Sequence, residues 1–221
     1  MSEHLGRIKG IFLDFDGTIV DSSEAYVEAA RIACERIGCV ALDRKAALEI
    51  PKRMELKLPL RGIPQADVSR FLDVYLKTFY ETSMEKSRPF YCVDEALLKL
   101  SQKAKLALVT MRFISGTAVA KQLRYFGLDK YFTYVATSLD TPKPKPSPEI
   151  LVKSAEHLNV RLSDCMVVGD SISDIRAGKA VGVTTVSVLS GLFSRGELVR
   201  EAPDLILDNV NELPRHVDFL E

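Results

Sequence analysis

The sequence predicts an α/β protein in which a doubly wound parallel sheet carries an all-helical module inserted after its first strand. Over the second half of the chain, short apolar runs alternate with amphipathic helical patterns, which is typical of a parallel sheet covered on both faces. A similar apolar run lies near the N-terminus, and residues 22–82 between them show helical patterns and no convincing strand. We therefore place the core at residues 1–19 and 86–221 and the helical module at residues 20–85.

The first predicted strand, at residues 11–13, ends in two carboxylates, Asp14 and Asp16, followed by Gly17. Residues i and i+2 of an extended segment point the same way, so both carboxylates face one side. Like charges at the end of a buried strand resist desolvation unless a positive group accompanies them. Mg²⁺ would satisfy them, because it accepts one or two carboxylates and completes its shell with water and phosphate oxygens. A simple Asp/Gly turn is the alternative.

The helical module is predicted from three amphipathic segments. The clearest is residues 67–80, where apolar side chains recur at i, i+3, i+4 and i+7. Two helices are predicted before it, the second at residues 41–50. Pro51 and later prolines then interrupt the chain and bound a basic pair, Lys52 and Arg53.

From residue 86 onward the predicted strands and helices alternate. In chain order they are a helix at 94–102, a strand at 105–110, a helix at 116–126, a strand at 134–136, a helix from 148, a strand at 165–168, a helix from 174, and strands at 184–188 and 205–206.

Polar residues lie at the ends of these strands, at the edge where open parallel sheets bind ligands. Asp14 and Asp16 follow the first strand. Thr110 ends the second strand of the core, and Asp170 follows the fourth. Asp174 falls in the first turn of the next helix, where an acid also suits the helix dipole. The acids of the first and fourth strands together predict an all-oxygen site for a hard cation.

A proline-rich loop at 141–149 supplies a candidate cation for the same edge. Ser147 is expected to cap the next helix, with Pro148 at its first position. This arrangement favours Lys145 over Lys143, because it fixes Lys145 just ahead of the helix on a stiff segment. A fixed ammonium suits a phosphate oxygen or a carboxylate nucleophile. The alternative is a solvated Pro-x-x-Pro spacer with two surface lysines.

The composition excludes several classes of partner. The 30 Lys and Arg residues balance 30 Asp and Glu residues, so no net charge indicates binding to nucleic acid or to an anionic membrane. The sequence shows neither a signal-peptide pattern nor an apolar run of membrane length. The four cysteines form no Cys-x-x-Cys pair and are expected to be reduced. We expect a cytoplasmic monomer or homodimer that binds a small molecule.

Four motifs in order give the chain a family resemblance. They are Asp-Phe-Asp-Gly-Thr at 14–18, Thr110, Lys145-Pro-Ser-Pro, and Gly-Asp-Ser-Ile-Ser-Asp at 169–174. The chain resembles the haloacid dehalogenase-like hydrolase superfamily, in the branch with a helical (C1) cap after the first strand. Within it the chain is most similar to phosphoglycolate phosphatase-like proteins. The resemblance covers nearly the whole length and implies a Rossmann-like α/β core with a helical cap.

The resemblance also implies roles for individual residues. Asp14 is the nucleophile and forms an aspartyl-phosphate. Asp16 protonates the leaving alcohol and then activates the hydrolytic water. Thr110 and Lys145 hold the phosphoryl group, and Lys145 also orients Asp14. Such positioning and charge neutralisation is what phosphoryl transfer requires most.

The metal ligands implied by the resemblance are Asp14, Asp170 and the backbone carbonyl of Asp16, which bind Mg²⁺, with Asp174 in support. One departure lies beside Thr110, where Met111 replaces the usual asparagine. The backbone N–H of Met111 could still serve the phosphate, but a side-chain role is lost.

Three basic residues are candidates for contacting the substrate. In the family, the region of Lys52 and Arg53 faces the active site, where a basic pair would suit a second anionic group such as a carboxylate. A solvated pair in a loop explains these two residues equally well. For Arg112, two residues after Thr110, the same two interpretations stay open.

These observations favour an Mg²⁺-dependent phosphatase that hydrolyses a small phosphorylated metabolite, with 2-phosphoglycolate as the best single candidate. A β-phosphoglucomutase-like phosphomutase, which returns the phosphoryl group to a sugar hydroxyl, is the first alternative. A non-catalytic protein that binds phospho-ligands is the second. Dehalogenase chemistry is disfavoured, because that branch lacks the second aspartate that is present here as Asp16.

Overall fold

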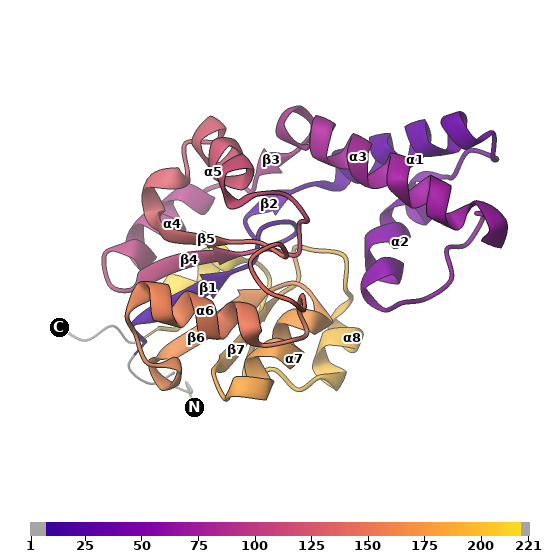
Figure 1. The fold of residues 1–221 in the computed structure, drawn as a ribbon. Helices are drawn as coiled ribbons and strands as arrows, with labels where there is room; N and C mark the ends of the chain where they lie inside the picture. Colours follow the sequence, from indigo (N-terminus) through magenta and orange to yellow (C-terminus); the bar gives the residue numbers. More distant parts are fainter. Residues whose placement is uncertain (1–7, 218–221) are drawn as a thin grey trace. The chain divides into compact units, whose positions relative to one another are not determined.

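The computed structural model describes residues 8–217, and the chain divides into two compact units (Figure 1). One unit combines the residues up to Val20 with those from Pro89 onward. The other spans Asp21–Arg88, compared with the 20–85 expected from the sequence. Where the chain passes between the units, the short strands β2 (Val20–Asp21) and β3 (Arg88–Pro89) pair with each other.

The first unit is built on a six-stranded parallel sheet in the order β5-β4-β1-β6-β7-β8. Its strands are β1 (Gly10–Leu13), β4 (Lys105–Val109), β5 (Phe132–Ala136), β6 (Cys165–Gly169), β7 (Thr184–Val188) and β8 (Leu205–Leu207). Leu13 at the end of β1 is level with Leu108 of β4 and Val168 of β6. The carboxyl ends of these three strands therefore meet at one edge, and the predicted α/β fold is confirmed.

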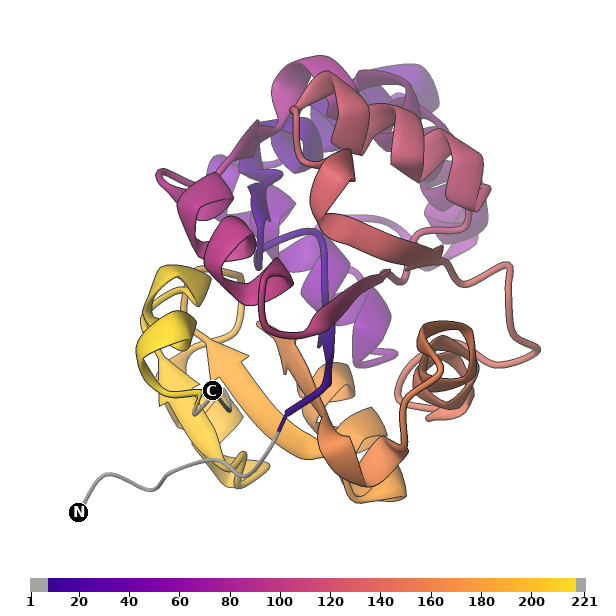
Figure 2. The same ribbon diagram turned by 90° about the vertical axis from the view of Figure 1, so that its left-hand side faces the viewer.

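Within residues 8–217, five α-helices accompany this sheet, and helices cover both of its faces (Figure 2). They are α4 (Val93–Ser101), α5 (Gly116–Tyr125), α6 (Glu149–Leu158), α7 (Ile172–Val181) and α8 (Arg195–Arg200). Side chains of β1 alternate between the faces, as the pleat requires. Ile11 and Leu13 share a hydrophobic core with Leu97 of α4, whereas Phe12 packs in a second core with Ile150 of α6. This alternation produces the doubly wound arrangement.

Short 3-10 helices complete the connections. They are η1 (Gln65–Asp67), η2 (Asp129–Tyr131), η3 (Leu162–Asp164) and η4 (Val210–Arg215). Among the helices of residues 8–217, none combines the length and apolar character needed to cross a bilayer.

The second unit contains α1 (Ser23–Ile37), α2 (Arg44–Glu55) and α3 (Val68–Lys86) around a hydrophobic core of its own. On α3, Phe71, Tyr75 and Phe79 follow one another at i, i+4 spacing and are buried. The spacing seen in the sequence therefore places this helix correctly, and the helix continues past residue 80 to Lys86.

Helix α2 runs through Pro51, so the predicted interruption at that residue is wrong. A proline inside a helix removes one backbone hydrogen bond and favours a kink. Ala47 and Ile50 on the same helix are only 2% exposed, in the core of the unit. Their packing holds the helical conformation across the proline.

Candidate active site at the strand ends

Polar residues follow the three central strands, where parallel sheets bind ligands. Asp14 follows β1, and its N–H donates to the carbonyl of Val168, 2.9 Å away. Thr110 follows β4 and Asp170 follows β6, the two neighbours of β1. The chain builds the sheet outward from β1 through β4 and β5, then returns to add β6 on the other side. The candidate site therefore lies at the point where the strand order reverses.

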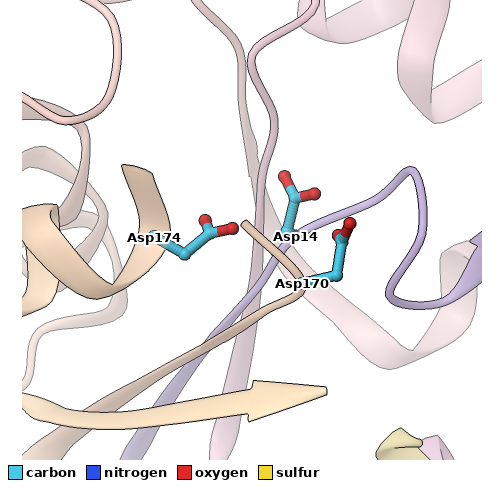
Figure 3. Close-up of side chains that lie close together, drawn as sticks. All are labelled: Asp14, Asp170 and Asp174. Carbon is cyan, nitrogen blue, oxygen red and sulfur yellow. The ribbon is translucent and has the colours of Figure 1, made fainter. Parts of the chain in front are cut away.

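Asp14, Asp170 and Asp174 form a buried acidic cluster (Figure 3). They come from three segments: the end of β1, the end of β6 and the first turn of α7. One carboxylate oxygen from each lies within 4.8 Å of those of the other two. Carboxylates do not gather in a protein interior without a compensating positive charge.

Lys145 supplies one such charge. Its Nζ donates to Asp14 Oδ1 at 2.8 Å, to Asp174 Oδ1 at 2.6 Å and to the carbonyl of Val109 at 3.1 Å. The side chain is only 1% exposed, whereas Lys143 of the same loop is exposed. The structure therefore brings Lys145, and not Lys143, to the acidic cluster.

The loop reaches this position without the cap expected from the sequence. Helix α6 begins at Glu149, with Pro148 as its N-cap and no side-chain hydrogen bond, so the predicted capping by Ser147 is wrong. The backbone N–H of Ser147 donates to the carbonyl of Pro144 instead, which closes a turn around Lys145. That turn holds the lysine in place.

Asp14 and Lys145 change each other's affinity for protons. Burial raises the pKa of Asp14 to about 7; the Lys145 ammonium opposes this shift, and the charge of Asp174 adds to it. Burial favours a lower pKa for Lys145, but the charges of Asp14 and Asp174 together outweigh it and raise that pKa. Lys145 thus pairs with two of the three buried carboxylates, Asp14 and Asp174.

Glycines make room for this cluster. A Cβ on Gly169 would overlap the Asp174 carboxylate, and a Cβ on Gly191 would overlap the Asp170 carboxylate. Gly17 also approaches Asp170 closely, and its φ of +82° favours glycine. The backbone therefore comes nearer to these side chains than any other residue type would allow.

Hydrogen bonds orient the two aspartates that follow β6. Ser171 and Asp174 form a capping box at the start of α7, in which the side chain of each accepts from the backbone N–H of the other. Ser171 Oγ also donates to Asp174 Oδ2 at 2.8 Å. The Thr18 hydroxyl donates to Asp170 Oδ1 at 3.1 Å. Lys145 and Ser171 each donate to one oxygen of Asp174. Asp174 is therefore placed to orient Lys145.

Asp16 does not belong to the acidic cluster, because its carboxylate pairs with Arg112. Arg112 Nε and Nη2 each donate to one Asp16 oxygen at 2.7 Å. The Arg112 side chain is 3% exposed and the Asp16 side chain 13%, so the arginine is buried and the aspartate partly exposed. The sequence left the role of Arg112 open, and the only signal for it was its position two residues after Thr110. The resemblance implies only the backbone carbonyl of Asp16 as a metal ligand, and the structure shows its side chain paired with Arg112.

Met111, Lys52 and Arg53 are the remaining predicted residues. The Ser173 hydroxyl donates to the sulfur of Met111, 3.5 Å away, beside the acidic cluster. Lys52 and Arg53 lie on α2 of the helical unit. Arg53 Nε donates to the carbonyl of Pro59 at 2.6 Å, so Arg53 has a partner within its own unit. Substrate contacts by Lys52 and Arg53 remain predictions.

Sequence reasoning missed Thr18, Ser171 and Gly191 as parts of the site. Thr18 and Ser171 lie inside two of the motifs, which was a signal that could have been followed. Gly191 lies in the loop after β7, outside every motif. Its closeness to Asp170 depends on how that loop folds back, which no local pattern reports.

The acidic cluster could hold a divalent metal ion. All its donors are carboxylate oxygens, which suit hard cations such as Mg²⁺, Mn²⁺ and Ca²⁺. Their spacing of 4.8 Å or less is comparable to the about 4 Å between opposite oxygens in a magnesium shell. Asp14 and Asp170 are the direct ligand candidates, because Lys145 and Ser171 already donate to the two oxygens of Asp174.

Comparison with known proteins identifies relatives that match nearly the whole of this chain. The family model for haloacid dehalogenase-like hydrolases matches residues 11–188. A pyrophosphatase, PpaX, from Halalkalibacterium halodurans is 30% identical over 210 residues, covering 94% of this chain and 95% of the relative. A phosphoglycolate phosphatase from Neisseria meningitidis is 28% identical over 226 residues, covering 96% and 95%.

Solved structures show the same fold. A haloacid dehalogenase-like hydrolase from Streptococcus pneumoniae superposes with a TM-score of 0.81 at 19% identity, covering 95% of this chain and 98% of the other. A hydrolase of that superfamily from Geobacter sulfurreducens superposes with a TM-score of 0.69 at 25% identity, covering 93% and 97%. The architecture described above is therefore shared along nearly the whole chain.

Proposed function

Since the chain belongs to the haloacid dehalogenase-like hydrolases, we propose that it is an Mg²⁺-dependent phosphatase that acts through an aspartyl-phosphate on Asp14. The resemblance seen in the four sequence motifs is confirmed, as is the prediction of a phosphatase-like hydrolase. The observation that carries the mechanism is the position of Lys145. Its ammonium donates hydrogen bonds to both Asp14 and Asp174, which lie beside Asp170.

In the first step, a carboxylate oxygen of Asp14 attacks the phosphorus of the ester. Lys145 already donates to Asp14 Oδ1, which leaves Oδ2 as the attacking atom. A bond forms between this oxygen and phosphorus, the bond from phosphorus to the leaving oxygen breaks, and Asp16 gives that oxygen a proton. Thr110 and the N–H of Met111 would hold the phosphoryl oxygens.

In the second step, water attacks the phosphorus of the aspartyl-phosphate and passes a proton to Asp16. The bond between phosphorus and the Asp14 oxygen breaks, inorganic phosphate forms, and the Asp14 carboxylate is restored. Each step is a single displacement, and the covalent intermediate allows one set of groups to serve both.

Asp14, Asp170 and the backbone carbonyl of Asp16 would hold Mg²⁺, with Asp174 orienting Lys145 and Asp14. When bound, the ion neutralises negative charge on the phosphoryl oxygens and on the attacking carboxylate. The grouping of three buried carboxylates within 4.8 Å supports this assignment. Lys145 supplies the remaining positive charge.

The proposed substrate is a small phosphorylated metabolite, and 2-phosphoglycolate is the first candidate. The relative named phosphoglycolate phosphatase supports it. Pyrophosphate is a second candidate, because the relative from Halalkalibacterium halodurans is named a pyrophosphatase. Both molecules carry a second anionic group. We also infer a cytoplasmic location, which the free thiols of Cys34, Cys39, Cys92 and Cys165 support.

Phosphate release from 2-phosphoglycolate, pyrophosphate and p-nitrophenyl phosphate tests this function, with Mg²⁺ or with excess chelator. We expect release to require the metal and Asp14→Asn to lower it by orders of magnitude, because the nucleophile is lost. Asp164→Asn is the matched control, since Asp164 pairs with Lys9 and Arg161 outside the acidic cluster. Wild-type activity in Asp14→Asn would contradict the proposal.

A further inference from the structure

The end of α1 brings Cys34 and Cys39 together. Gly38 follows the helix in the left-handed conformation, with a φ of +74°. The backbone N–H of Cys39 donates to the carbonyl of Cys34 at 3.1 Å. The N–H of Gly38 donates to the carbonyl of Glu35 at 3.4 Å. These two bonds form a Schellman motif, in which the side chains of the first and sixth residues often touch, and in this chain both residues are cysteines.

Their backbone hydrogen bond limits the separation of the two cysteines. Standard bond lengths and angles, added to its 3.1 Å, place the two Cα atoms at most about 7 Å apart. Disulfides join Cα atoms that lie about 4.4–6.8 Å apart, so the turn is compatible with one. Both thiols are free, and they interact. Burial raises the pKa of Cys34 to about 11, and a hydrogen bond with the Cys39 side chain adds to that shift.

The two thiols differ in their access to solvent. Cys34 is 1% exposed and belongs to the hydrophobic core of the helical unit. Cys39 is half-buried and packs against the edge of that core. A reagent in solution therefore meets Cys39 first, whereas burial protects Cys34 from it. Cys34 is thus placed as the resolving thiol, which attacks its neighbour once that neighbour has reacted.

We propose that Cys34 and Cys39 form a reversible disulfide, which makes the end of α1 a redox-sensitive site. The oxidant is a low-molecular-weight disulfide such as oxidised glutathione. The Cys39 sulfur, as a thiolate, attacks one sulfur of the oxidant, whose S–S bond breaks to release one glutathione. Cys34 then loses its proton and attacks the Cys39 sulfur, which releases the second glutathione. Two electrons pass from the cysteines to the oxidant, and each departing glutathione takes up one of their two protons.

The disulfide would close a ring at the start of the link from α1 to α2 (Figure 1). Leu42 of this link packs against the same core as Cys34. The link ends at Asp43, whose side chain caps α2 by accepting from the N–H of Ala46 at 2.7 Å. A cross-link across the turn restricts the unfolded chain, so folding and disulfide formation favour each other. The folded protein should therefore keep the disulfide in a more reducing buffer than the unfolded chain.

The test equilibrates the full-length protein with graded mixtures of reduced and oxidised glutathione, folded and in concentrated urea. Free thiols are then alkylated, and the protein is digested with trypsin. Cleavage after Arg36 separates the two cysteines, so the disulfide joins peptide 32–36 to peptide 37–44 in the mass spectrum. We expect the value of [GSH]²/[GSSG] at half-formation to be at least about 10-fold higher for the folded protein.

Cys39→Ser should abolish the joined peptides, and Cys92→Ser, in the other unit, should leave them unchanged. Half-formation at the same glutathione ratio in the folded and unfolded chains would overturn the role of the pair. Glutathione on Cys39 beside an alkylated Cys34 in the folded protein would do the same, because Cys34 would then have failed to resolve the mixed disulfide. Phosphate release enters none of these measurements, so their outcome is independent of the proposed function.

Discussion

Lys145 is the residue on which the buried carboxylates depend. It bonds Asp14 and Asp174 at once, and its side chain is 1% exposed. Removing one partner of a buried ion pair leaves an uncompensated charge and costs about 3–5 kcal/mol. We expect Lys145→Met to lose that stability in urea unfolding and to lose phosphatase activity. Lys143→Met, on the exposed lysine of the same loop, should change neither. Equal stability of the two variants would contradict the account.

The raised pKa of Asp14 predicts how the metal-free protein responds to pH. Burial raises the pKa of Asp14 to about 7 in the folded protein, from the ordinary value of 3.8 that applies to the unfolded chain. The folded state therefore binds more protons between about pH 4 and 7, and the Asp14 contribution to stability falls as the pH rises through that window. Asp14→Asn lacks this loss.

Thermal unfolding in excess chelator at pH 5 and pH 8 checks this sign. We expect the melting temperature of Asp14→Asn, relative to wild type, to be higher at pH 8 than at pH 5. A difference that stays constant, or that falls as the pH rises, would show that burial does not dominate the environment of Asp14.

At the scale of elements, the site depends on backbone segments that approach the aspartates closely. A Cβ on Gly191 would overlap Asp170, so Gly191→Ala should push this carboxylate away. We expect the Mg²⁺ concentration for half-maximal activity to rise by about 10- to 100-fold, as for other losses of support around a metal. Gly196→Ala in α8 is the control, since a Cβ there meets nothing within 4 Å. An unchanged Mg²⁺ requirement in Gly191→Ala would remove Asp170 from the metal site.

Much of the element order could be predicted, because buried strands and amphipathic helices have distinct periods. The strand at 184–188 agrees in both bounds with β7. Pro51 was misjudged because local propensity favours a break, whereas the buried neighbours Ala47 and Ile50 favour the helix. Tertiary packing overrides propensity in such cases, and the sequence does not display packing.

The site residues at strand ends were also predictable, because their positions follow from where apolar runs stop. The pair of Asp16 with Arg112 was not, since the two residues lie 96 positions apart. They meet because β1 and β4 pair in a particular register. Lys145 could be favoured over Lys143 from sequence, although the helix cap used to favour it does not form.

At the scale of the whole molecule, the proposed chemistry belongs to one of the two units. Asp14, Thr110, Lys145, Asp170 and Asp174 all lie in the unit built on the parallel sheet. The proposed nucleophile, the buried ammonium and the acidic cluster are thus held by one compact unit, which suits a reaction that depends on positioning. Substrate recognition by Lys52 and Arg53 of the helical unit stays a prediction.

Covalent labelling of Asp14 tests the central claim most directly. Asp16→Asn keeps the nucleophile but lacks the group that activates water, so it should accumulate the aspartyl-phosphate. We expect acid quenching during turnover of p-nitrophenyl phosphate, followed by peptide mass spectrometry, to find one phosphoryl group on Asp14 in this variant. Asp14→Asn/Asp16→Asn should carry none. Phosphate release without a label on Asp14, or with a label on another residue, would contradict the account.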